Sequence, residues 1–207
     1  MDDTPVGLYI HVPFCIQICP YCAFYKLPVG QALMNQFTKY LIDEIKIYYK
    51  KYGRIKVDTL FFGGGTPNIL PNHLINQIFD QLNRCFDIDT GAEITMEMNP
   101  GVHSKAKLRF LKSLGVNRVS IGVQSFKDTV LNDYGRNHTA REAKLFIENI
   151  FNVGFENNSI DIIFGHPKHS IDDLTFSLNQ IAAYDFHHVS LYGLTIEKNT
   201  PFYLSKL

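Results

Sequence analysis

Short apolar runs and longer segments of helical period alternate along the chain, and this order restricts the fold more than any other feature. The runs are rich in β-branched and aromatic residues, which predicts strands at LYIHV (8–12), DTLFFG (58–63), EITMEM (93–98), RVSIGVQ (118–124), SIDIIFG (159–165) and HVSLYGLT (188–195). Consecutive strand–helix units build a parallel sheet covered by helices. Six strands are too few for a closed eight-stranded barrel, so we expect an α/β fold, a partial (βα)6 parallel barrel.

The intervening segments predict helices near 31–51, 71–86, 104–114, 139–153 and 172–184, with a shorter turn around 127–134. Ser104, Thr139 and Asp172 are placed as N-caps, and Gly115 and Gly154 as C-terminal caps. The sequence contains no linker rich in Pro, Ser or Gly and no low-complexity tract. We therefore expect one domain over residues 1–207.

Three cysteines, Cys15, Cys19 and Cys22, lie within eight residues just after the first predicted strand. Thiolates are soft ligands that suit iron–sulfur clusters, and C-x3-C-x2-C lets three of them reach one cube while the fourth iron stays open. The alternative is a structural zinc site, which needs a fourth ligand such as His11 or Cys85. Cys85 ends an amphipathic segment, which favours a small buried thiol.

Polar and glycine-rich residues follow the other predicted strands at their carboxyl ends, where parallel βα barrels carry their functional groups. They are Gly63–Thr66, Glu97 and Asn99, Gln124, and Asp161 within the fifth strand. The glycine loop is not a triphosphate loop, because Thr66 and Pro67 follow it and no lysine is near. A ligand loop and a tight turn at the strand end both remain open for it.

With 20 basic and 20 acidic side chains, the chain offers no electrostatic basis for binding nucleic acid. Neither a signal peptide nor a membrane span is apparent, so we expect a cytoplasmic protein. Four cysteines in a chain of this length also favour a reducing compartment over a disulfide framework.

Long strings spread over nearly the whole chain carry a family resemblance. They are GLYIHVPFCIQICPYCAF, DTLFFGGGTPNIL, EITMEMNPG, GVNRVSIGVQSF, LNDYGRNH, IDIIFG and HVSLYGLTIEKNTPFY. In this order they resemble the radical S-adenosylmethionine (SAM) core of oxygen-independent coproporphyrinogen III oxidases and their HemW heme-chaperone relatives. The resemblance implies a [4Fe-4S] cluster and SAM as cofactors, an electron donor for the cluster, and heme as cargo for an unknown acceptor protein.

The resemblance also assigns roles to individual residues. It implies that Cys15, Cys19 and Cys22 ligate the cluster, and that Tyr9, Gly64 and Glu97 contact the SAM bound to the open iron. Positions that hold a second SAM in the oxidase match Tyr21, Gly65, Thr66, Gln124, Arg136 and Asp161. An ordinary ion pair or loop brace is the alternative for Arg136 and Asp161.

Departures from the family pattern separate the two relatives. The oxidase has a further cysteine two residues after the third ligand, where this chain has Phe24 after Ala23, and this favours HemW. The sequence stops shortly after the sixth strand, so the C-terminal domain of both families is expected to be missing. In FGHPKHS, which replaces the usual FGLPGQ-type turn, His166 and His169 are interpreted as solvated loop histidines rather than heme ligands.

Three hypotheses follow for function. The first is a HemW-like heme chaperone, and the second is an enzyme, the oxygen-independent coproporphyrinogen III oxidase, which Ala23 and the missing domain disfavour. The third is a truncated remnant without function, which exposed apolar surface around Tyr192, Phe202 and Tyr203 would favour.

Overall fold

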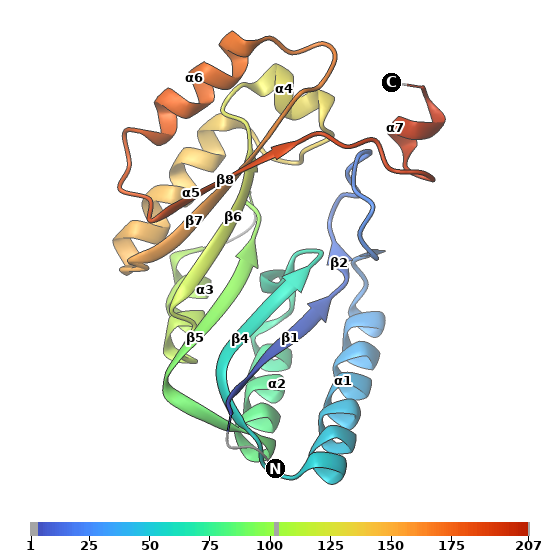
Figure 1. Cartoon of the computed structure of the whole chain (residues 1–207), viewed down its shortest axis with the longest axis vertical. Helices are drawn as coiled ribbons and strands as arrows, with labels where there is room; N and C mark the ends of the chain where they lie inside the picture. The colour runs from blue at the N-terminus through green and yellow to red at the C-terminus, as the bar shows by residue number, and fades with distance from the viewer. Residues whose placement is uncertain (1–3, 102–103, 207) are drawn as a thin grey trace.

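The computed structural model describes residues 4–101 and 104–206 and contains the predicted six-stranded sheet. Its strands are β1 (Val6–Val12), β4 (Lys56–Gly64), β5 (Asp87–Met98), β6 (Arg118–Gln124), β7 (Asn157–Phe164) and β8 (His188–Gly193). They lie in this order across the sheet, and every neighbouring pair is parallel. The sheet curves into an open arc with β1 and β8 at its two edges, which is a partial barrel (Figure 1).

Helices cover the outer face of this arc (Figure 1). They are α1 (Gln31–Tyr52), α2 (Asn72–Cys85), α3 (Lys105–Ser113), α5 (Ala140–Val153) and α6 (Ile171–Ile181). The short helices α4 (Asp128–Asp133) and α7 (Pro201–Leu204) lie at the carboxyl ends of the strands instead (Figure 1). Each of the five long helices falls within two or three residues of its predicted range. Among the described residues, no helix is both long and apolar enough to cross a bilayer.

The helix caps agree with the sequence in all but one case. Ser104 and Thr139 accept hydrogen bonds from the first turns of α3 and α5, and Gly154 ends α5 with a left-handed φ of 86°. Gly115, with a φ of 98°, follows Leu114, the residue that caps α3. The assignment of Asp172 as an N-cap was wrong, because Ser170 caps α6 in a reciprocal pair with Asp173 and so starts the helix earlier.

The main core lies between the sheet and the helices, and the alternation of side chains along the strands creates it. On β6, Val119, Ile121 and Val123 are fully buried against the helices. The intervening residues of β6, such as Ser120 and Gln124, point to the opposite, concave face of the arc. Apolar burial against the helices therefore leaves the concave face for polar side chains.

The cysteine loop, residues 13–26, leaves the end of β1 and is held by backbone hydrogen bonds on both sides. Strand β2 (Phe14–Cys15) lies at the start of the loop and pairs in parallel with β3 (Leu27–Pro28), which follows the loop. The Thr66 amide donates to the Phe14 carbonyl over 2.8 Å, and the Phe202 amide donates to the Pro20 carbonyl over 3.1 Å. The loop is thus fixed between the glycine loop after β4 and helix α7, as Figure 1 shows.

Candidate metal and cofactor site

A cavity of about 290 Å³ lies at the carboxyl ends of the strands, beside the cysteine loop. All the predicted site residues line it except Tyr9 and Thr66. They are Cys15, Cys19, Tyr21, Cys22, Gly64, Gly65, Glu97, Gln124, Arg136 and Asp161. Residues from six separate segments therefore meet at one place, as the strand-end rule predicts.

The three cysteines carry free thiols beside the cavity. Cys19 is buried, while Cys15 and Cys22 are half-buried at the cavity wall. Three thiol ligands gathered beside one cavity suit a group that presents several metal corners, such as an iron–sulfur cluster.

Neither residue considered as a fourth zinc ligand lines the cavity. The ring nitrogens of His11 contact the Tyr9 hydroxyl at 3.1 Å and the Tyr25 carbonyl at 2.9 Å. Cys85 ends α2 just before β5 begins, so it lies at the amino ends of the strands, whereas the cysteine loop lies at their carboxyl ends. It is buried and accepts a hydrogen bond from the Gln81 amide over 2.9 Å, which confirms the small buried thiol.

The glycine loop makes close backbone contacts that explain two of its glycines. Gly64 has a φ of 110°, a left-handed conformation that favours glycine, and its amide donates to Glu97 Oε2 over 3.0 Å. A Cβ on Gly65 would lie 2.6 Å from the Phe14 carbonyl oxygen, so this glycine lets the loop pack against the cysteine loop. Thr66 is buried behind the cavity, where its hydroxyl accepts from Asn99 Nδ2 over 2.7 Å.

Arg136 is the centre of a buried polar network that joins three strand ends to the cysteine loop. Its Nη2 donates to Asn99 Oδ1 over 2.5 Å and to the Gly122 carbonyl over 2.6 Å. Its Nη1 lies 3.4 Å from the Tyr21 hydroxyl and 3.5 Å from Cys19 Sγ. Among the described residues, Arg136 forms no salt bridge with Asp161, but its contacts with Tyr21 and Cys19 are those of a loop brace, the other alternative for this residue.

Two carboxyl groups face the cavity under conditions that disfavour their negative charge. Burial raises the pKa of Glu97 to about 7, and the charge of Asp161 adds to this rise. Burial also raises the pKa of Asp161, whose carboxyl accepts from the Ser120 hydroxyl over 3.2 Å. A ligand with a positive charge, such as an amine or a sulfonium, would relieve this penalty. The electrostatics of the cavity thus suit SAM.

Two buried polar atoms in the cavity wall have no hydrogen-bond partner. They are Gln124 Oε1 and Arg136 Nε. Gln124 also has a φ of 71°, which is uncommon for a residue other than glycine. Unpaired atoms and backbone strain of this kind are concentrated at ligand sites.

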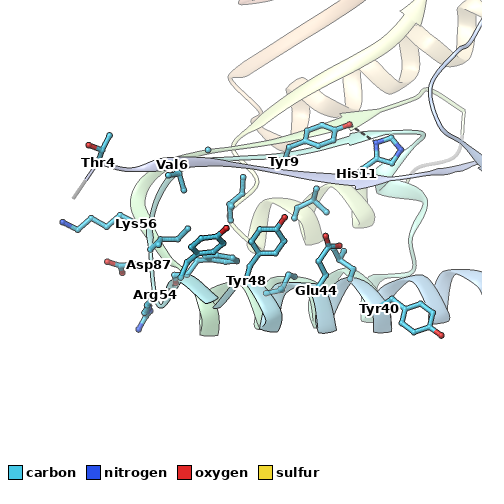
Figure 2. A pocket seen from close by; sticks show the side chains of 18 of the residues that line it. Thr4, Val6, Tyr9, His11, Tyr40, Glu44, Tyr48, Arg54, Lys56 and Asp87 are labelled. Atoms are coloured by element: carbon cyan, nitrogen blue, oxygen red, sulfur yellow. Dashed lines mark hydrogen bonds between the residues drawn. The ribbon is translucent and has the colours of Figure 1, made fainter. Parts of the chain in front are cut away.

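Tyr9 lies on β1 at the edge of the sheet rather than in the cavity wall. It borders a groove of about 1150 Å³ between β1 and α1, which Figure 2 shows with Tyr48 of α1 on the opposite side. Its hydroxyl contacts His11 Nδ1, the dashed line in Figure 2. Burial raises the pKa of the Tyr9 phenol, and the negative charge of Glu97 raises it further.

The interpretation of His166 and His169 as solvated loop histidines was wrong. His166 is only 3% exposed, and the side chain of His169 is 10% exposed. The loop after β7 folds onto Tyr134 and Phe202, so both rings pack against aromatic neighbours. Phe202 is itself buried, whereas Tyr192 and Tyr203 are exposed. The exposed apolar surface that would favour a truncated remnant is therefore only partly present.

The sequence placed Asn99 at a functional strand end without giving it a role, and Ser120 was not predicted as a site residue. Asn99 links Thr66 to Arg136, and Ser120 hydrogen-bonds Asp161. Alternation along the fourth predicted strand, residues 118–124, was a usable signal for Ser120, since it shares a strand face with Gln124. No sequence pattern indicated the partners of Asn99.

Comparison with known proteins agrees with this fold. Residues 9–181 match the model of the radical SAM superfamily, and the chain belongs to this superfamily. The chain is 37% identical to the heme chaperone HemW of Bacillus subtilis over 196 residues, 94% of this chain and 52% of that protein. It is 36% identical to HemW of Escherichia coli over 201 residues, 96% of this chain and 53% of that protein.

The fold also resembles a solved structure, the coproporphyrinogen III oxidase HemN of Escherichia coli, a radical SAM enzyme. The TM-score is 0.86 at 28% identity, over 92% of this chain and 44% of that one. The chain thus spans about half the length of the curated relatives that it matches. Membership of the superfamily implies a [4Fe-4S] cluster and SAM.

Proposed function

We propose that the chain is the radical SAM core of a HemW-like heme chaperone, which binds heme and transfers it to an acceptor protein. The similarity to HemW proteins over 94–96% of this chain carries the proposal. The sequence Ala23-Phe24 supports it as well. The resemblance places a fourth cysteine of the oxidase two residues after Cys22, and this chain has Phe24 at that position. A cytoplasmic location belongs to the proposal, since free thiols and a reduced cluster require a reducing compartment.

In this proposal the three cysteines hold a [4Fe-4S] cluster and the cavity residues hold SAM. When bound, the cluster supplies one electron to the sulfonium of SAM, from an external reductant. Glu97 would accept a hydrogen bond from a polar group of SAM, and Gly64, whose amide donates to Glu97, would present its backbone to the same region. Arg136 orients Asn99, Tyr21 and Cys19, and thereby keeps the loop and the strand ends in one arrangement.

Anaerobic reconstitution with iron and sulfide tests the cluster. We expect the wild type and Cys85→Ser to take up four iron and four sulfide per chain, the content of one [4Fe-4S] cluster. Cys19→Ser should lose the cluster absorption. Cys85→Ser is the matched control, because its thiol is buried in α2 away from the cavity. Equal iron uptake by Cys19→Ser would contradict the assignment of these ligands.

Heme titration separates the chaperone from the oxidase, which the HemN structure favours as second candidate. A chaperone should bind heme saturably and pass it to an apo-hemoprotein, without releasing carbon dioxide from a porphyrinogen. Decarboxylation in the presence of dithionite and SAM would favour the oxidase instead. Absence of both heme binding and decarboxylation would reject both functions for this chain.

A further inference from the structure

A second group of ligand-type side chains lies outside the cavity, where the loop after β7 meets the end of α4. Within residues 4–101 and 104–206, it brings together Asp133, His166 and His169, each with one ligand atom within 4.8 Å of the others. We propose that these three side chains bind one divalent first-row transition-metal ion, such as Zn²⁺. Two imidazoles and one carboxylate are the donor set that such ions prefer.

The local sequence places both histidines on one side of a turn. In His166-Pro-Lys-His169, the His169 amide donates to the His166 carbonyl over 3.0 Å, which closes a four-residue turn with proline at its second position. The first and fourth side chains of the turn consequently stack, with ring centroids 4.3 Å apart and planes inclined by 23°. A single ion thus has both rings within reach.

The carboxylate of Asp133 and the ring of His169 lie as far apart as two ligands of one metal ion. Asp133 Oδ2 lies 3.0 Å from His169 Nε2. Metal–nitrogen and metal–oxygen bonds of about 2.0–2.2 Å place two ligand atoms of one ion about 3.0–3.5 Å apart. An ion can therefore replace this hydrogen bond without moving the main chain.

Neighbouring groups hold the two rings in these positions. Tyr134 packs edge-on against His166 and His169, with centroids 5.6 Å and 5.3 Å away. The Lys168 amide donates to His166 Nδ1 over 3.2 Å in the absence of metal. The carboxylate of Asp133 is 38% exposed and leaves a path from solvent, so water completes the coordination.

A single aromatic side chain, that of Tyr134, separates the proposed metal site from Tyr21 of the cysteine loop. Tyr134, which covers both histidines, also packs edge-on against Tyr21 with centroids 5.5 Å apart. A bound ion ties the end of α4 to the loop between β7 and α6, and so fixes Tyr134 behind Tyr21. The role of the ion is structural, and it does not depend on the proposed heme function.

A cobalt titration tests the proposal in the full chain with Cys15, Cys19 and Cys22 all changed to serine, which removes the competing thiolates. We expect one equivalent of Co²⁺ to bind, with ligand-field absorption and without a sulfur-to-cobalt charge-transfer band. Zn²⁺ should displace it. His169→Ala in this background should weaken Co²⁺ binding more than about 100-fold, since losing even an outer-shell partner costs about 10–100-fold. His73→Ala, which removes an exposed histidine of α2, is the matched control.

Asp133→Asn provides a second variant that preserves folding, because the amide can still hydrogen-bond His169. It should also lose most of the affinity, while circular dichroism shows unchanged secondary structure. Affinity equal to that of the parent in Asp133→Asn, or no Co²⁺ binding by the parent up to millimolar concentration, would overturn the proposal. The three side chains would then form an ordinary ion pair with a stacked neighbour.

Discussion

Replacing Glu97 with glutamine should stabilise the protein in the absence of cofactors, because burial makes this carboxylate costly to ionise. Its pKa rises from 4.5 to about 7 in the folded chain. At about 1.36 kcal/mol per pKa unit, this difference corresponds to about 3.4 kcal/mol. The side chain is half-buried, so solvent lowers the cost, and we expect about 1–3 kcal/mol.

The sign of the pH dependence follows from proton binding. The unfolded chain releases this proton near pH 4.5, whereas the folded chain keeps it to about pH 7. Stability therefore falls as the pH rises through this range, and the full cost is present above pH 7. Glu97→Gln removes the cost, so its advantage over the wild type should be small at pH 5 and complete at pH 8.5.

Urea unfolding at these two pH values measures the effect. Glu156→Gln, an exposed carboxyl just before β7, is the control and should behave as the wild type does. The same Glu97→Gln variant should bind SAM more weakly at pH 8.5. An advantage of equal size at pH 5 and pH 8.5, or none at either, would refute the reasoning.

Three further predictions concern the surroundings of the cavity. Gly65→Ala should destabilise the chain by about 1–3 kcal/mol and reduce iron uptake, because its Cβ would lie 2.6 Å from the Phe14 carbonyl oxygen. Gly30→Ala, where the nearest atom is 3.8 Å away, should have little effect on either measurement. Arg136→Met should cost about 2–4 kcal/mol in urea unfolding, since it strips the Gly122 carbonyl of its donor, and a normal stability would contradict the network. Burial lowers the pKa of Lys107 to about 8, so the wild type should gain stability between pH 8 and pH 10.5; Lys107→Met should lack this gain.

The sheet was predictable because strand and helix periods differ clearly in this sequence. All six strands exist, but β5 begins at Asp87 rather than residue 93. Residues 87–92 carry no alternating pattern, and Asp87 and Ile88 join the sheet only through pairing with Lys56 and Val57. Strand extension of this kind depends on a neighbour that is distant in sequence.

The candidate site was predictable to the extent that strand ends converge. Glu97, Gln124 and the cysteine loop meet because parallel strands end at one edge. The turn at His166 was not predictable, because the groups that bury it, Tyr134 and Phe202, come from two other segments of the chain. Local polarity alone suggested solvent exposure for this turn.

The two outer strands of the sheet, β1 and β8, are the places where a strand of another chain could pair with this one. In the part of the chain that the structure describes, neither β1 nor β8 has a strand beside its outer edge, and β1 borders the open groove of Figure 2. Strand β1 contains no lysine and no proline, the residues that usually discourage pairing with another chain. Strand β8 adds the exposed side chains of Leu191 and Tyr192. Both edges therefore present backbone groups to which another strand can add, and a lysine introduced on β1 should discourage such pairing.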